Sequence, residues 1–324
     1  MHRLHAHIVV HLMVVVALLL SSTIVVGAWH VVPLRINGSA LQARPARPVA
    51  LSLEERVTYQ RTIEEVYWQR RIWPQENPTP KPPLDAVLSP AQLRAKVENG
   101  LRLSKALEIY WGQPVSGEQL QAELDRMARR SQQPAVLRQL WQTLGNDPYV
   151  IAEMLARPLL AERLVREYYA HDGRFHGALK ARARADLERV TSADDLRLTS
   201  GQYTEFEWIK REGDNASRAE AGTSMLIAAQ EWEARLDSLA QTFGRPAREL
   251  AAGQISALRE NQDSFYVTAV LERAADRIRV TTVEWRKRSF EDWWQSVREQ
   301  IPADVPALRY AYRLPDLAVT TCTD

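Results

Sequence analysis

Few histidine and cysteine side chains lie beyond the apolar N-terminal segment. His171 and His176 lie close together in the segment HDGRFH, where two imidazoles could bind a metal ion or share a proton. No acid-rich segment surrounds them, so a role on the surface or at a helix end is the simpler interpretation. Beyond the apolar N-terminal segment the third histidine is His30, and Cys322 is the single cysteine of the chain. With no HExxH or CxxC spacing, we predict no metal site, and no disulfide can form within the chain.

Motifs for nucleophilic catalysis and nucleotide binding are also absent. The sequence contains no GxSxG, GxGxxG or GxxxxGK[ST]. The carboxylate pairs Glu64-Glu65 and Asp194-Asp195 stand in highly charged surroundings and are interpreted as solvated faces. We therefore assign no catalytic residue, no nucleotide and no cofactor.

The aromatic residues indicate a different function, in which they would bind apolar side chains of another polypeptide. Trp68, Trp111, Trp141 and Trp232 fall on helical stripes and are predicted core residues. Five others are candidates for peptide binding, with packing in a core as the alternative: Phe206, Trp208, Tyr266, Trp293 and Trp294. Trp293 and Trp294 point about 100° apart on one helix. One of them should therefore either pack back onto the helical domain or stay exposed.

Helix signals dominate the chain from Ser52 to Leu187. Ser52 with Glu55 and Ser116 with Gln119 form capping boxes. Further helices are expected from Ser89 to about Trp111 and from Pro134 to Gly145, with restarts at Asp147-Pro148 and Arg157-Pro158. These signals predict a compact set of short helices joined by tight turns.

The pattern changes after Leu187. The segment TSGQYTEFEWIKREG alternates with period two, which predicts a half-buried strand. A helix is expected from about Ser224 to Phe243. GQISAL, SFYVTAVLE and IRVTTVEW are further strand candidates, and a last helix should begin at Ser289.

The N-terminal segment predicts export. Residues 1–28 join a mildly cationic start to an apolar run, which is typical of a cleaved signal peptide. An uncleaved membrane anchor is the alternative, because the run approaches the ~20 residues that span a bilayer. In either case the rest of the protein would be extracytoplasmic, in the periplasm or cell envelope. The net charge of +2, without a basic stripe, argues against nucleic-acid binding.

The helical block resembles the N-terminal domain of SurA- and PrsA-type foldases and is also similar to the substrate-binding region of trigger factor. The likeness covers roughly residues 52–190. It rests on Ala106-Leu107-Glu108 through Gly112, on Val115-Ser116 with Glu118 and Leu120, and on Leu144-Gly145-Asn146-Asp147 through Leu164.

The second half is similar to a parvulin prolyl-isomerase domain. The segments that carry this likeness are Leu250 to Ser256, Phe265-Tyr266-Val267 and Val270-Leu271-Glu272. Active parvulins carry a histidine on the first strand, where this chain reads YTEFEW. They carry a second on the last strand, where Tyr266 stands here. The resemblance therefore implies a degenerate module whose catalytic residues are missing.

Together these observations predict a mainly α-helical chaperone domain plus a small α+β, parvulin-like module. The expected organisation is a signal or anchor (1–28), a tether (29–51), a helical domain (52–190), the parvulin-like module (198–288), and a C-terminal helix and tail that pack on the helical domain (289–324). The first functional hypothesis is an extracytoplasmic chaperone that holds unfolded or exported polypeptides. The alternatives are an active prolyl isomerase and an envelope protein with one dedicated partner. Membrane contact is expected only through the N-terminal segment.

Overall fold

The computed structural model describes residues 50–77, 79–211, 224–304 and 310–317. The predicted signal or anchor, most of the tether and Cys322 lie outside these residues. Within the described part of the chain, no helix combines the length and the apolar character needed to cross a bilayer.

Two compact units make up the chain, and two of the four points at which the chain passes from one to the other lie inside helices. The first unit holds residues 1–98, 115–158 and 305–324, and the second holds 99–114 and 159–304. Helix α4 (Pro90–Trp111) and helix α8 (Arg157–His171) each contribute residues to both units.

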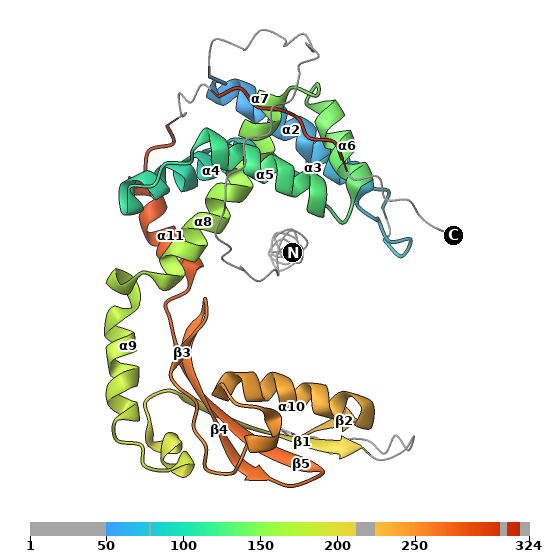
Figure 1. Cartoon of the computed structure of the whole chain (residues 1–324). Coiled ribbons are helices and arrows are strands. Elements are labelled where there is room, and N and C mark those ends of the chain that lie inside the picture. Colours follow the sequence, from blue (N-terminus) through green and yellow to red (C-terminus); the bar gives the residue numbers. More distant parts are fainter. Residues whose placement is uncertain (1–49, 78, 212–223, 305–309, 318–324) are drawn as a thin grey trace, which may run out of the picture. The chain divides into compact units, whose positions relative to one another are not determined.

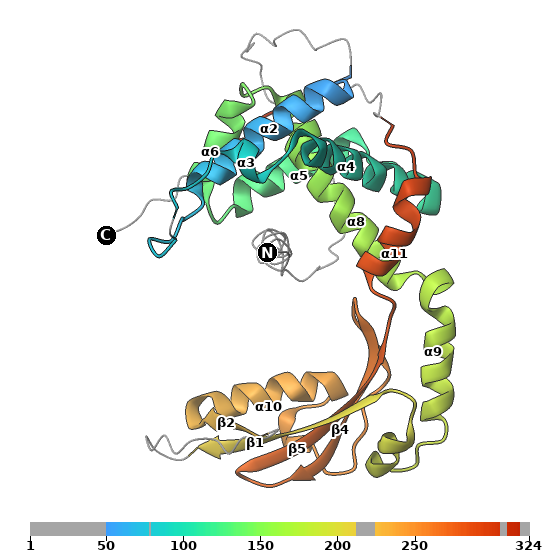
Figure 2. The same cartoon turned by 180° about the vertical axis from the view of Figure 1, so that it is seen from behind.

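Short helices build the first unit, as their caps predict (Figure 2). In both predicted capping boxes, at Ser52 and Ser116, the two reciprocal hydrogen bonds are present. Apolar side chains of these helices, such as Ile63, Leu124 and Ile151, form the buried interior. The helices of this unit are α2 (Leu53–Arg70), α3 (Leu84–Val87), the start of α4, α5 (Gly117–Arg130), α6 (Pro134–Thr143) and α7 (Pro148–Ile151).

The chain does not break at Arg157-Pro158, where a new helix was expected after a turn. A π-helical segment, Ala152–Ala156, joins α7 directly to α8. Proline donates no hydrogen bond to the residue four before it, and its ring crowds that carbonyl group. The wide turn just before Pro158 therefore lets the helix continue.

The second unit combines helices with a five-stranded mixed sheet, whose strand order is β2-β1-β5-β4-β3. Strand β1 pairs parallel with β2 and antiparallel with β5, and the remaining pairs are antiparallel. The strands are β1 (Gln202–Arg211), β2 (Ser224–Ala228), β3 (Arg259–Glu260), β4 (Ser264–Arg273) and β5 (Arg277–Arg286). The helices are α9 (Gly173–Leu187), α10 (Ala229–Phe243) and α11 (Phe290–Val297), with single 3₁₀ turns at Ala193–Leu198, Ala247–Glu249 and Arg298–Gln300.

Two expectations for this unit are wrong in detail. Residues 224–228 pair with β1 as a strand, so the predicted helix begins only at Ala229. The segment GQISAL is not a strand. It contributes a single bridge, between Ile255 and Ala269, and the edge strand β3 follows it.

Helical elements cover both faces of the sheet. Figure 1 shows α10 lying over one face. There Trp232 and Leu236 of α10 share a core with Val270, Ile278 and Val280 of the sheet. The opposite face is covered by the end of α9 and the 3₁₀ turn at Ala193–Leu198. Its core residues include Ala183, Leu196, Phe265, Val267 and Trp285.

Candidate peptide-binding site

The structure brings two of the three predicted sheet aromatics together. Phe206 and Trp208 lie on the face that α10 covers, with ring centroids 5.8 Å apart. The register puts Tyr266 on the same face but level with Gln202, four residues along β1 from Phe206. All three side chains are half-buried. A peptide-binding role for them stays a prediction.

Neither Trp293 nor Trp294 of α11 is exposed. Trp293 stacks on Tyr169 with ring centroids 4.5 Å apart. Trp294 stacks on Phe290, and its Nε1 donates to Asn99 Oδ1 of α4 at 2.8 Å. Trp294 therefore packs on α4 and is not exposed. A peptide-binding role for the pair stays a prediction.

Trp293 lies at the centre of a cluster of rings, here called the aromatic cluster. Its members come from the end of α4, the end of α8, the start of α9 and helix α11, all within the second unit. The members are Tyr110, Trp111, Tyr168, Tyr169, Phe175, Phe290, Trp293 and Trp294. Such ring pairs contribute beyond the area they bury, so the cluster should hold these four elements firmly.

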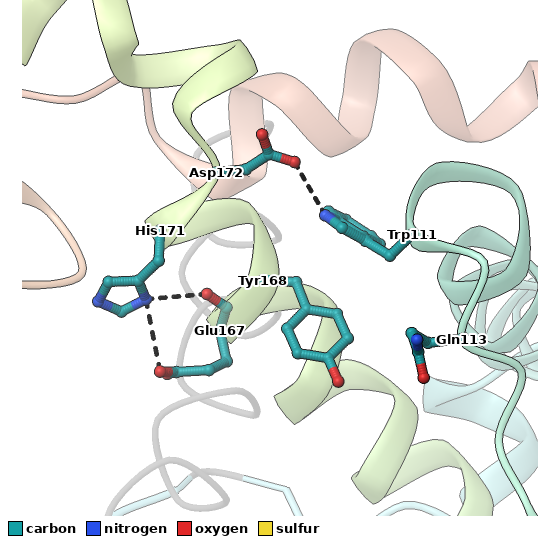
Figure 3. A pocket seen from close by; sticks show the side chains of 6 residues that line it. All are labelled: Trp111, Gln113, Glu167, Tyr168, His171 and Asp172. Atoms are coloured by element: carbon teal, nitrogen blue, oxygen red, sulfur yellow. Dashed lines mark hydrogen bonds and ion pairs between the residues drawn. The ribbon is translucent and has the colours of Figure 1, made fainter.

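A cleft of about 630 Å³ opens at the edge of the aromatic cluster. Figure 3 shows the rings of Trp111 and Tyr168 near each other in this cleft. Their centroids are 5.6 Å apart. The remaining lining is polar: Gln113, Glu167, His171 and Asp172.

Two helix ends position these side chains. Gly112 ends α4 with φ 62°, a left-handed conformation that glycine adopts without strain. The N–H groups of Gly112 and Gln113 donate back to Glu108 and Leu107, which leaves Trp111 in the last turn and Gln113 at the rim. Asp172 lies between α8 and α9, where it caps α9 by accepting from the Arg174 N–H at 2.8 Å.

Asp172 accepts several hydrogen bonds at the edge of the cleft. Hydrogen bonds from Arg174, with further ones from its backbone and from Trp111 Nε1, lower the pKa of Asp172 to about 2, although partial burial opposes them. The Trp111 Nε1–Oδ2 distance is 2.9 Å. Asp172 is therefore occupied in positioning Trp111 and Arg174.

Replacing Asp172 by Asn should lower the free energy of unfolding by an amount on the order of 1 kcal/mol at neutral pH, because the cap survives and the ion pair is lost. The folded-state pKa is depressed, so this stabilisation is present above about pH 4 and lost as the pH falls towards about 2. Denaturant unfolding at several pH values checks this. A difference between the two proteins that does not shrink over that interval would contradict it.

Glu167 is the carboxylate of the cleft that remains accessible. Its side chain is 40% exposed, with Oε1 3.4 Å from His171 Nδ1. Gln262 donates weakly to its other oxygen, at 3.4 Å. Glu167 can therefore receive a cation from outside the protein.

No family model matches the chain, and no curated protein or solved structure shows significant similarity to it.

The two histidines do not form an acid–base pair. His171 ends α8, where its Nδ1 lies 3.0 Å from the Glu167 carbonyl oxygen, so the helix-end role is confirmed for it. His176 is buried edge-on against Tyr169, and its Nε2 has no hydrogen-bond partner among the described residues. Burial, with repulsion from Lys287, lowers the pKa of His176. The described residues contain no group of three side chains suited to a metal ion.

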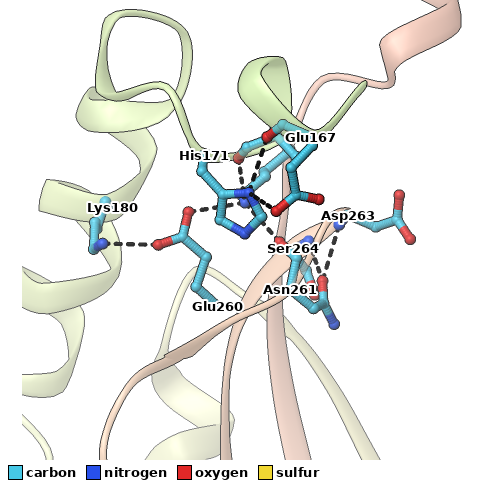
Figure 4. A network of polar contacts seen from close by, with 9 residues as sticks. Glu167, His171, Lys180, Glu260, Asn261, Asp263 and Ser264 are labelled. Atoms are coloured by element: carbon cyan, nitrogen blue, oxygen red, sulfur yellow. Dashed lines mark hydrogen bonds and ion pairs between the residues drawn. The ribbon is translucent and has the colours of Figure 1, made fainter. Parts of the chain in front are cut away.

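A polar network around the buried Lys287 lies beside the cleft (Figure 4). Lys287 Nζ donates to Glu260 Oε1 at 3.0 Å and to the carbonyl oxygens of Ala170 and Asn261, each at 2.7 Å. Lys180 Nζ donates to the other oxygen of Glu260 at 2.8 Å. Burial would raise the pKa of Glu260, but these two ammonium groups outweigh it and hold the pKa below its usual range. The network ties the end of β5 to the end of α8, which carries the cleft.

Sequence reasoning missed the cleft because its two walls are far apart in the chain. The stripe on which Trp111 falls predicts a core residue, whereas the structure places Trp111 half-buried at the cleft. The available signal was an aromatic residue at one helix end (WGQ) and an aromatic and acidic helix end elsewhere (EYYAHD). Nothing local pairs those two ends.

Proposed function

We propose that the protein is an extracytoplasmic chaperone that binds unfolded or exported polypeptides at the Trp111–Tyr168 cleft. The observation that carries this proposal is the combination of two aromatic rings with the accessible carboxylate of Glu167 in one open cleft. The mechanism is reversible burial of client side chains, without covalent chemistry or nucleotide. The resemblance of residues 52–190 to SurA- and PrsA-type foldases supports the same function.

The cleft favours side chains with an apolar stem and a cationic tip. The stem of a lysine or arginine can lie on the rings of Trp111 and Tyr168, and its charge can face both the rings and Glu167. Each such contact contributes roughly 0.5–1 kcal/mol at an exposed site, so clients would exchange rapidly and specificity would be broad.

In this proposal the α+β module is an accessory binding surface, and it resembles a parvulin that lacks its histidines. In this chain β5 follows β4 and lies between β4 and β1 in the sheet, and Tyr266 of β4 stands where the parvulin resemblance would place the second histidine. This supports binding over isomerisation as the role of the module. Acceleration of X–Pro isomerisation in a proline peptide by the wild-type protein would instead favour the isomerase alternative.

A binding experiment on the cleft tests the proposal. A fluorescent, proline-free peptide of alternating Lys and Leu should bind at least about tenfold more tightly than its Glu/Leu counterpart, because the cleft is acidic. Tyr168→Ala should weaken binding of the Lys/Leu peptide about fivefold, as expected for loss of one cation–π contact. Fluorescence anisotropy measures both effects, and the same variant should suppress aggregation of a denatured client less well.

Matched controls lie outside the cleft. Tyr67→Ala removes a tyrosine of α2 that is 47% exposed, and Glu188→Lys changes an exposed carboxylate at the end of α9. Both should bind the peptide as the wild type does, whereas Glu167→Lys should not. Equal binding of the two peptides, or an unaffected Tyr168→Ala protein, would refute the proposal. Failure of aggregation suppression with intact peptide binding would favour a dedicated partner.

A further inference from the structure

The C-terminal tail lies on the first unit as an extended peptide. Residues 310–317 form neither helix nor strand. Tyr310, Tyr312 and Leu314 are half-buried, and the intervening Ala311 and Arg313 are exposed. Alternate burial is the pattern of a strand laid on a surface.

Gln121 of α5 holds the tail through its backbone. The side-chain amide Nε2 of Gln121 donates to the carbonyl oxygen of Arg313 at 2.9 Å, and Oε1 accepts from the Arg313 N–H at 2.8 Å. Asp125 accepts a second bond from Nε2 at 3.1 Å, which orients the amide. Because both bonds to the tail reach main-chain atoms, any residue except proline can be held in this way.

The start of α5 is shaped for the ring of Tyr310. A Cβ atom on Gly117 would lie 2.2 Å from Cδ2 of that ring. Gly117 is helical with ordinary backbone angles, so the need for glycine here is the close approach of the ring.

Tyr312 occupies a second seat. Its ring centroid lies 6.2 Å from that of Tyr149 and 5.1 Å from that of Tyr310. Its hydroxyl is buried, yet has no hydrogen-bond partner among the described residues. Burial, and to a smaller extent the charge of Glu153, raise the pKa of Tyr312 to about 12. This site therefore accommodates the aromatic ring but offers no hydrogen bond to the hydroxyl, so a phenylalanine ring would fit it better.

We infer that Gly117, Gln121 and Tyr149 line a groove for extended polypeptide segments with bulky apolar side chains at alternate positions. The chain's own tail occupies this groove and competes with such segments. A groove that binds many different sequences must recognise features that they share. Gln121 binds only main-chain atoms, and the sites for the rings make no hydrogen bond to a hydroxyl. The nature of the competing ligand rests on the proposed function, whereas the occupation of the groove by the tail does not.

A peptide with the sequence of residues 308–317 tests the groove. In the full chain, the doubly substituted tail Tyr310→Ala/Tyr312→Ala should free the groove. Its affinity for the labelled peptide should exceed that of the wild type by about tenfold or more, because the attached tail competes at high effective concentration. Fluorescence anisotropy measures the affinity, and circular dichroism verifies folding. Arg313→Pro is a second tail variant that removes the N–H accepted by Gln121 and leaves both rings in place.

Groove substitutions in the released background should abolish this gain. Gln121→Ala and Gly117→Ala should each weaken peptide binding about tenfold, the second although alanine is the better helix former. The matched controls are Gln142→Ala on an exposed face of α6 and Gly177→Ala in α9, where a Cβ meets nothing within 4 Å. Both controls should bind normally.

Two unrelated peptides decide the ligand class. One carries Phe at alternate positions followed by Leu, and the other has the same residues with the bulky ones adjacent. Binding of the first alone supports the groove. If only the tail peptide binds, if no peptide binds, or if light scattering shows dimers that exchange tails, the inference is overturned. Tyr168→Ala should leave binding of these peptides unchanged, so failure here is distinct from failure of the cleft.

Discussion

Replacing Glu153 by Gln should lower the free energy of unfolding by about 3–5 kcal/mol, because the substitution leaves buried cations without their counter-charge. Glu153 lies in the π-helical segment, and its side chain is 1% exposed. Arg56 Nη2 lies 2.7 Å from its Oε2, and Arg157 Nη2 lies 2.8 Å from its Oε1. Both guanidinium groups are 2% exposed. Water cannot stabilise these two buried positive charges as it would at the surface, so their stabilisation depends on the carboxylate of Glu153.

Glutamine is the informative replacement because it keeps the shape and one acceptor oxygen. Urea unfolding followed by circular dichroism measures the change. Glu188→Gln, which removes an exposed carboxylate, should change the free energy of unfolding by less than about 0.5 kcal/mol. A loss at Glu153 no larger than at Glu188 would show that the two arginines are not held by this charge.

Local signals were sufficient to predict much of the helical architecture. The capping boxes at Ser52 and Ser116 are present with both bonds, and Pro134 begins α6 as its fixed φ favours. The strands β4 and β5 also follow the predicted segments, because both are rich in β-branched and aromatic residues. In these elements the sequence pattern and the final packing agree.

Elements decided by pairing with distant residues escaped prediction. Residues 224–228, SMLIA, suit a helix as well as a strand, and their parallel pairing with β1 selects the strand. The bonds between Gln121 and Arg313 join residues 192 apart in the chain. Trp111 and Asp172 of the cleft are 61 apart. No local pattern encodes such contacts, so the candidate site could not be derived from the sequence.

The buried arginines also escaped prediction. Arg56 lies in an apparently polar stretch of α2, and nothing in its neighbours indicates that it is 2% exposed. Charged residues are rarely buried unless paired, and the pairing partner, Glu153, is supplied by another helix. The burial of such polar residues is therefore determined only when the helices pack together.

Replacing Lys287 by Met should lower the free energy of unfolding by about 3 kcal/mol, because three oxygen atoms lose a buried donor. The Lys287 side chain is 1% exposed and follows directly after β5. Methionine fills a similar volume, so the loss reports the charge and its hydrogen bonds rather than a cavity.

Lys180→Met is the matched control, since it removes the other ammonium group that binds Glu260. Lys180 is 38% exposed, so its loss should cost less than about 1 kcal/mol. Thermal unfolding compares the two variants.

His176 supplies an independent readout, because Lys287 contributes to the lowering of its pKa. In Lys287→Met that pKa should rise towards its ordinary value while burial still holds it down, as an NMR titration of the His176 ring would show. Equal losses of stability in the two lysine variants, together with an unchanged His176 titration, would mean that the ammonium of Lys287 does not organise the network beside the cleft.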